Sequence, residues 1–142
     1  MPGSALRTAI VLLSLVSMTT GVLALDPGQS VLYCTGAKFG EDNAKTIEGC
    51  TNLIREATPL LESGEPDPTG KANWYFSRGF AYARSSDYER AVADFSKAIE
   101  INPDIDGIVY HYRALARSKA GGDADQIKAD RTKACSLDKK YC

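Results

Sequence analysis

Small and aromatic side chains recur at fixed intervals between residues 72 and 103, and this pattern constrains the fold more than any other feature of the chain. Tyr75, Gly79 and Tyr82 occupy positions i, i+4 and i+7, which lie on one face of a helix. A second run has the 3.6-residue period of an amphipathic helix: Tyr88, Ala91, Val92, Phe95, Ala98 and Ile99. The pattern predicts two consecutive helices that pack closely, with Gly79 at their contact because a large side chain there would hold the helices apart.

The ends of the second helix are also marked in the sequence. Ser86 and Glu89 have the S-x-x-E spacing of a capping box, in which the serine accepts a hydrogen bond from a free backbone amide and the glutamate reaches back. Asn102 and Pro103 end the helix, because proline has no amide proton and restricts the residue before it. The segment is therefore predicted to form a helical hairpin.

The order of these residues resembles the tetratricopeptide repeat, with Tyr75 in place of its tryptophan and Arg78 in place of its leucine. The residues that we expect to be structural are Tyr75, Gly79, Tyr82, Ala91, Phe95, Ala98 and Pro103. The resemblance implies an all-α fold, a short right-handed superhelix of antiparallel helix pairs with about five helices.

Weaker copies of the pattern flank the strong one. Tyr110 and Arg113 follow Tyr75 and Arg78 by 35 residues, and residues 129–134 echo residues 93–98, so a longer loop is expected near Gly121 and Gly122. Arg117 and Arg131 replace an aromatic residue each, which suits an outward face at the end of an array. Upstream, Cys50 takes the position of Phe95 in a half-repeat. The expected organisation is a signal peptide (1–24), an N-terminal segment (25–41), a half-repeat helix (42–62), a loop rich in Gly and Pro (63–71), a first repeat (72–105), a degenerate second repeat (106–138) and a tail (139–142).

The N-terminus has the composition of an export signal. Arg7 is the only charged residue before Asp26, the stretch from Thr8 to Leu25 is mostly apolar, and small residues allow cleavage after Ala24. An uncleaved membrane anchor is the alternative, because the apolar run approaches the length of a membrane span. We expect a periplasmic or secreted protein without a membrane span after cleavage, similar to small exported bacterial tetratricopeptide-repeat proteins.

Four cysteines follow the signal, an even number that favours disulfides in an oxidising compartment. Three pairings are possible, and we favour Cys34–Cys50 with Cys135–Cys142 because each closes a local loop. The second pair requires the chain to turn back after Leu137, so residues 139–141 are expected to be non-helical. A zinc site is the competing interpretation, but the spacing lacks the clustered Cys and His residues of such sites.

The resemblance places partner peptides in a concave groove formed by the first helix of each repeat. The positions that would face it are Asn73, Phe76, Phe80, Arg84, Ile108, His111, Leu115 and Lys119. Arg84 and Lys119 would favour a ligand with a carboxylate, although exposed basic residues on helices are far more often plain solvated charges. Phe76 and Phe80 fit an ordinary core as well.

The sequence therefore predicts a non-catalytic scaffold that binds a protein or peptide, without a cofactor or metal. With a formal net charge of −1, which becomes −2 if Arg7 is removed with the signal, nucleic acid is an unsuitable partner. Glu89, Asp94 and Glu100 are expected on a solvated helix face, and His111 lacks a catalytic neighbour in sequence. The alternatives are a structural subunit of an envelope assembly, with self-association through the end of the array, and a small hydrolase.

Overall fold

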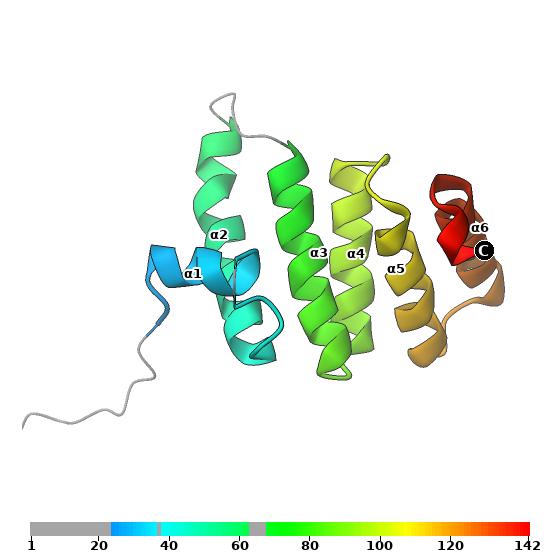
Figure 1. Ribbon diagram of the computed structural model, residues 1–142, viewed down its shortest axis with the longest axis horizontal. Helices are drawn as coiled ribbons and strands as arrows, with labels where there is room; N and C mark the ends of the chain where they lie inside the picture. The colour runs from blue at the N-terminus through cyan, green and yellow to red at the C-terminus, as the bar shows by residue number, and fades with distance from the viewer. Residues whose placement is uncertain (1–23, 37, 63–67) are drawn as a thin grey trace, which may run out of the picture.

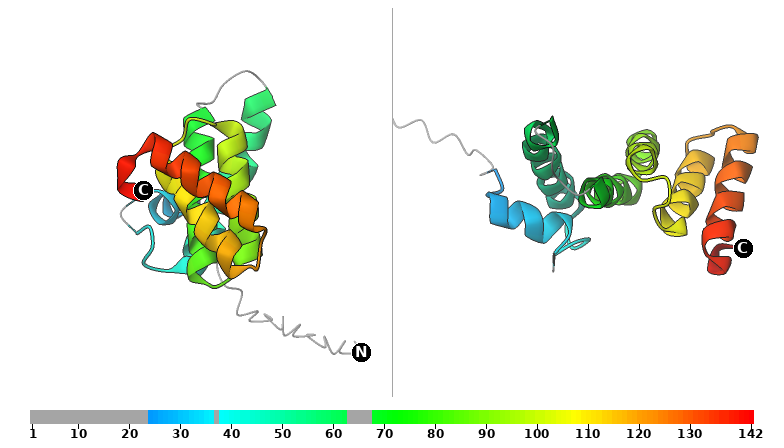
Figure 2. Two further views of the ribbon diagram at one scale, coloured as in Figure 1. Left: turned by 90° about the vertical axis from the view of Figure 1, so that its right-hand side faces the viewer. Right: turned by 90° about the horizontal axis from the view of Figure 1, so that it is seen from above.

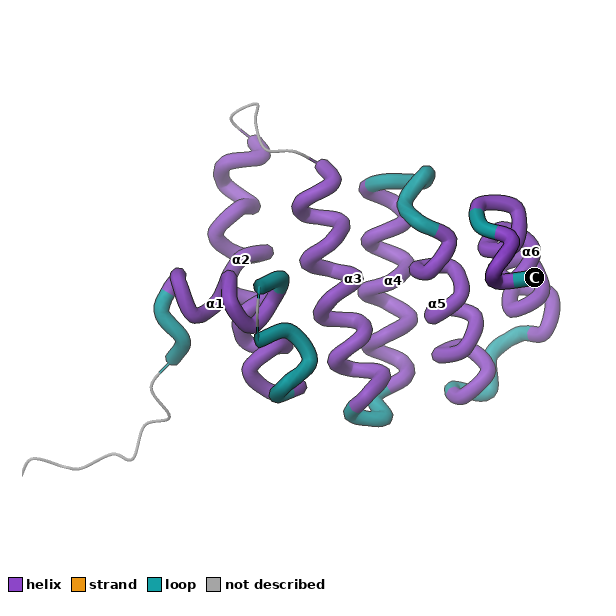
Figure 3. The backbone as a smooth tube through the Cα atoms, viewed as in Figure 1, coloured by secondary structure: helices purple, strands orange, loops and turns teal. Residues whose placement is uncertain are grey.

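The computed structural model describes residues 24–36, 38–62 and 68–142, and these ranges contain helices and loops without a strand (Figure 1, Figure 3). The elements are α1 (Pro27–Cys34), α2 (Asn43–Glu62), α3 (Pro68–Arg84), α4 (Tyr88–Ile101), α5 (Gly107–Lys119), α6 (Ala124–Leu137) and a 3₁₀ turn, η1 (Lys139–Tyr141). The all-α prediction is confirmed. The described residues hold six α-helices instead of about five, because α1 was not predicted.

Each helix packs against the next, and α3 with α4 and α5 with α6 form antiparallel pairs (Figure 1). Viewed from above, α1 and α3 lie on one side of the molecule and α2 and α4 lie on the other, while α5 and α6 lie side by side at the C-terminal end (Figure 2). Helix α5 also packs against α3, so the first helices of the two pairs are neighbours.

Aspartate side chains mark the starts of five α-helices. Each accepts a hydrogen bond from a backbone amide in the first turn: Asp26 for α1, Asp42 for α2, Asp87 for α4, Asp106 for α5 and Asp123 for α6. The capping box predicted at Ser86 is wrong, because Ser86 has φ +62°, whereas an N-cap residue typically has extended backbone. Asp87 takes that role, and its Oδ1 accepts from the amide of Arg90 at 3.3 Å.

The predicted loop at 63–71 extends too far at its C-terminal end. Helix α3 already begins at Pro68. Proline is favoured in the first turn of a helix because the amide that it lacks has no helical partner there. Residues 63–67 lie outside the described residues. The α5–α6 loop, residues 120–123, is longer than the α3–α4 loop, residues 85–87, as expected near Gly121.

The core lies where the helix pairs meet. It consists of Ala72, Ala91, Phe95, Ala98, Ile105, Val109, Tyr110, Ala116 and Ala134. Phe95 is completely buried, and a Cβ atom added at Gly79 would lie 3.0 Å from its ring. Gly79 therefore lets α3 and α4 approach closely, as the sequence predicts. Of the other expected structural residues, Tyr75 and Tyr82 are half-buried, and the carbonyl of exposed Pro103 accepts a hydrogen bond from Tyr110 Oη at 2.8 Å.

A buried ion pair joins α3 to α4. Arg78 Nε and Nη2 each donate to a carboxylate oxygen of Asp94 at 2.8 Å, and Arg78 Nη1 donates to Thr51 Oγ1 of α2 at 3.0 Å. The hydrogen bonds that Arg78 donates to Asp94 raise the pKa of Arg78. Asp94 is only 6 % exposed, so its predicted place on a solvated face is wrong. Because Arg78 binds three consecutive helices, we call this arrangement an Arg–Asp bracket.

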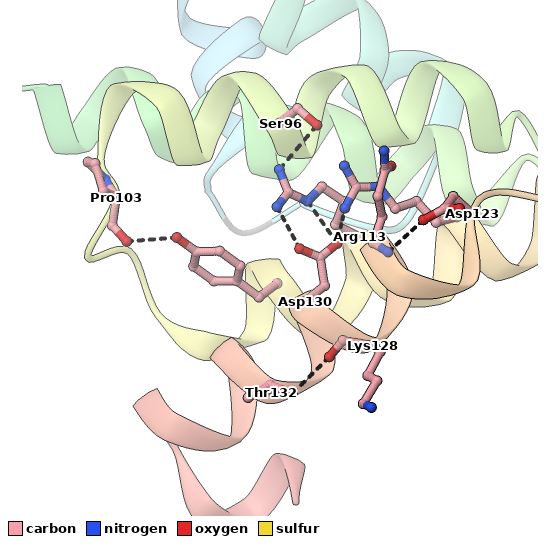
Figure 4. A network of polar contacts seen from close by, with 10 residues as sticks. Ser96, Pro103, Arg113, Asp123, Lys128, Asp130 and Thr132 are labelled. Atoms are coloured by element: carbon pink, nitrogen blue, oxygen red, sulfur yellow. Dashed lines mark hydrogen bonds and ion pairs between the residues drawn. The ribbon is translucent and has the colours of Figure 1, made fainter.

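The same bracket recurs in the next pair of helices (Figure 4). Arg113 of α5 donates to both oxygens of Asp130 of α6, at 3.0 and 2.6 Å, and to Ser96 Oγ of α4 at 3.3 Å. Arg117 also donates to Asp130 at 2.6 Å. The outward orientation predicted for Arg117 is therefore wrong, whereas Arg131 is exposed. The brackets explain why arginine takes the leucine position of the repeat pattern at residue 78 and again 35 residues later.

Cysteine pairs close both ends of the described chain. Cys34 and Cys50 join α1 to α2 with their Cα atoms 4.8 Å apart, and Cys135 and Cys142 join α6 to the C-terminal turn with their Cα atoms 4.6 Å apart. These are the two pairs that the sequence favours, and the chain does turn back after Leu137. Residues 139–141 are not irregular as expected: they form the 3₁₀ turn η1, which is short enough to reverse the chain.

Two predictions about export concern residues 1–24. This segment lies outside the described residues apart from Ala24. None of the described helices has the length and apolar character needed to cross a membrane.

Candidate functional site

A continuous row of rings crosses the face formed by α3, α5 and η1. We define this aromatic row by its members: Phe39, Phe80, Phe76, Tyr112, His111 and Tyr141. The centroids of Phe39 and Phe80 are 5.8 Å apart, and those of Phe80 and Tyr112 are 5.0 Å apart in an edge-on arrangement. At the far end His111 stacks on Tyr141 at 4.9 Å. These separations are in the range of favourable aromatic contacts.

Two hollows lie between α3 and α5 on either side of the Phe80–Tyr112 contact. The smaller hollow has a volume of about 140 Å³ and is lined by Phe39, Phe76, Phe80, Ile108 and Tyr112. The larger hollow has a volume of about 250 Å³ and is lined by Phe80, Ala83, Arg84, Tyr88, Tyr112, Leu115, Ala116 and Lys119. We refer to both hollows and the rings between them as the groove.

The structure brings together six of the eight residues that were predicted to face a groove. They are Phe76, Phe80, Arg84, Ile108, Leu115 and Lys119, which line one or both hollows. Asn73 is exposed and lines neither hollow. His111 also lines neither, because its ring lies between those of Tyr112 and Tyr141. Phe76 also belongs to the core, since its centroid is 5.9 Å from that of Phe95.

Tyr112 is the central residue of the groove, and the sequence analysis missed it. Its ring contacts Phe76, Phe80, Phe95 and His111. The sequence does contain a pattern that indicates Tyr112. Ile108, Tyr112, Leu115 and Lys119 occupy positions i, i+4, i+7 and i+11 and so lie on one face of a helix. The prediction placed His111 on this face in place of its neighbour.

Phe39 and Tyr141 extend the aromatic row beyond the repeats, and neither was predicted. Phe39 lies in the α1–α2 loop that the Cys34–Cys50 pair closes, and Tyr141 precedes Cys142 in the turn that the second pair closes. No periodic signal marks them, because both lie outside the main helices. The two cysteine pairs thus hold the segments that carry the ends of the row.

Arg84 fixes the α1–α2 loop against α3. Its Nη1 donates to the carbonyl oxygen of Gly40 at 2.6 Å. Gly40 has φ +79°, a conformation that side chains disfavour, and an added Cβ would lie 3.0 Å from the same nitrogen. Glycine at this position therefore allows the loop to place Phe39 beside Phe80.

The charged side chains that line the two hollows are both basic. Arg84 is engaged with Gly40, whereas Lys119 is exposed in the last turn of α5 and has no ion pair with any described residue. At the other end of the row, Lys140 Nζ lies 4.7 Å from the centroid of Tyr141, and a hydrogen bond with Asp138 raises the pKa of Lys140. Asp138 offsets the charge of Lys140, so the positive charge beside the aromatic row is that of Arg84 and Lys119.

The described residues include no group of three or more His, Cys, Asp or Glu side chains that could hold a metal ion. Burial raises the pKa of Tyr110, whose hydroxyl is already bound to Pro103, so this tyrosine serves the fold. The arrangement of rings and hollows is suited to contact with apolar side chains.

The helical hairpin formed by α3 and α4 also matches a known protein family. Residues 72–105 match the family model of the tetratricopeptide repeat. This repeat indicates a protein-interaction scaffold of a typically non-catalytic kind, with a protein as its partner. No curated protein and no solved structure matches the chain.

Proposed function

We propose that the chain binds an apolar segment of a partner protein in the groove between α3 and α5. The observation that carries this proposal is the aromatic row, which stays partly open to solvent where a core would be covered. Phe39 is 36 % and Leu115 is 42 % exposed. Large apolar side chains that gather at one hollow surface are typical of protein-interaction sites.

The proposed setting is the periplasm or the extracellular space. Two cysteine pairs at bonding distance favour an oxidising compartment, and the residues before Ala24 have the composition of an export signal. The cysteine pairs hold the segments that carry Phe39 and Tyr141, so the same compartment would keep the ends of the aromatic row in place. Self-association has less support, because the outer face of α6 carries exposed polar residues such as Lys128 and Thr132.

The test compares two leucines with the same exposure. Leu115 lies in the groove and Leu32 lies on α1, and both are 42 % exposed. We expect Leu115→Ser to abolish recovery of partner proteins after crosslinking in the exporting cell, and Leu32→Ser to leave it unchanged. Circular dichroism should show equal helicity for both variants. Equal recovery with both variants would exclude the groove as the binding surface.

The double substitution Phe76→Ala with Phe80→Ala is a poorer test. Phe76 packs against Phe95 in the core, so its truncation would also destabilise the fold. Exposed residues of the groove separate binding from folding more cleanly.

A further inference from the structure

The sizes of the two hollows limit what the groove can hold. Pockets for drug-sized molecules typically measure about 300–1,000 Å³. The hollows of about 140 and 250 Å³ are each smaller than this, and the contact between Phe80 and Tyr112 separates them. Each hollow therefore suits one side chain of a larger ligand, with the smaller side chain beside Ile108 and the larger one beside Leu115.

The two hollows follow one another along α3 and α5. On α3, Phe76 lines only the smaller hollow and Arg84 lines only the larger one. On α5, Ile108 lines only the smaller hollow and Lys119 lines only the larger one. With overlapping walls, the centres of the hollows are separated by roughly one to two helical turns, about 5–10 Å. Side chains i and i+2 of an extended segment point the same way and lie about 6.7 Å apart. An extended segment thus fits both hollows, and its residue i+4 would reach the end of α5.

The charge at that end is unpaired. Lys119 lines the larger hollow, and no described residue forms an ion pair with it. Arg84, the other basic residue of the lining, already donates to Gly40, and no acidic residue lines either hollow. A carboxylate on the bound segment would therefore meet Lys119 without a competing acid in the lining. Such a contact between exposed charges favours one orientation of the ligand more than it adds affinity.

From these observations we infer that the groove selects an extended segment with a small apolar residue at i, a large apolar residue at i+2 and an acidic residue at i+4. The carboxylate at i+4 lies against Lys119. This inference rests on the proposed function and adds the chemical class and direction of the bound segment.

The test uses a display library of random octapeptides, selected on the oxidised chain and in parallel on Lys119→Glu. We expect the oxidised chain to enrich two apolar residues at i and i+2 with Asp or Glu at i+4. We expect Lys119→Glu to keep the apolar pair and to replace the acid with Lys or Arg. Lys128→Glu, which makes the same change at an exposed cation on α6, is the matched control and should select as the unchanged chain does.

Fluorescence anisotropy with a labelled probe, Gly-Val-Ser-Phe-Ser-Glu-Gly, then measures the charge contact directly. We expect about two- to five-fold weaker binding when glutamine replaces its glutamate, and no such difference on Lys119→Gln. Peptides that need Leu115 but show no acidic preference would overturn this inference and leave the proposed function standing. A selection without peptides that need Leu115 would overturn both. Peptide binding that appears only when dilution dissociates a dimer would identify a second copy as the occupant and would also overturn the inference.

Discussion

Removal of one partner from an Arg–Asp bracket should destabilise the protein far more than removal of a partner from a surface ion pair. Helix α4 offers both cases. Asp94 pairs with Arg78 at 2.8 Å, and the two side chains are 8 % and 17 % exposed. Lys97 pairs with Glu100 at 2.7 Å, and those side chains are 44 % and 68 % exposed. The two ion pairs therefore have nearly the same N–O distance and differ in burial.

The magnitudes follow from burial. Breaking a buried pair by removing one partner costs about 3–5 kcal/mol, because the other charge stays buried without compensation. Asp94→Ala should fall at the lower end, about 3 kcal/mol, because Arg78 keeps some solvent contact and its bond to Thr51. The better helix propensity of alanine offsets about 0.5 kcal/mol of this. Glu100→Ala should cost at most about 0.5 kcal/mol, as exposed pairs within a helix do.

The assay is urea unfolding followed by circular dichroism, with thermal unfolding as a second measure. The net loss of about 2.5 kcal/mol for Asp94→Ala corresponds to a decrease in Tm of about 10 °C, and Glu100→Ala should shift Tm by about 2 °C or less. Replacing both partners, with Arg78→Met and Asp94→Leu, should recover most of the loss because no unpaired charge remains. Equal losses for Asp94→Ala and Glu100→Ala would refute the argument from burial.

Three further predictions concern packing, covalent closure and one hydrogen bond. Gly79→Leu should lower the free energy of unfolding, measured in urea, by about 3 kcal/mol. Gly70→Ala, with nothing within 4 Å of the added Cβ, should leave it unchanged or raise it by up to about 1 kcal/mol. Similar losses for both variants would contradict the close contact of Gly79 with Phe95. Replacing both cysteines of a pair with serine should cost about 3 kcal/mol for Cys34–Cys50 and about 2.5 kcal/mol for Cys135–Cys142, from sequence separations of 16 and 7. Mass spectrometry of non-reduced peptides would check the pairing first. A disulfide that joins Cys34 or Cys50 to Cys135 or Cys142 would invalidate both predicted stability losses. Tyr110→Phe should cost about 1 kcal/mol through the lost bond to Pro103, and an unchanged urea midpoint would show that this bond contributes nothing.

The sequence was sufficient for the helices and their close contacts because these depend on local periodicity and side-chain size. Gly79, Ala91 and Phe95 have the residue types that two packed helices demand, whatever surrounds them. The brackets could not be predicted in the same way. Arg78 and Asp94 are 16 residues apart, and a charged residue on a helix normally faces solvent. Only the packed structure shows that these two charges neutralise each other.

The groove was predicted only in part, for a physical reason that differs at each residue. Phe80 and Leu115 follow from the repeat pattern, because one face of the first helix in each pair is left uncovered. Tyr112 was missed by one position, an error of about 100° around the helix axis. Phe39 and Tyr141 could not have been found, since both lie outside the main helices, in segments that carry no periodic signal and that cysteine pairs and the Arg84–Gly40 bond hold in place.

The brackets also make the chain extendable in principle. Each arginine needs a hydroxyl on the helix before its own pair, supplied by Thr51 for Arg78 and by Ser96 for Arg113. Thr132 holds the corresponding place on α6, where its hydroxyl donates only to the carbonyl of Lys128 in its own helix (Figure 4). A grafted helix pair with its own arginine and aspartate would meet a ready acceptor there, so protein engineers could lengthen the binding face one module at a time.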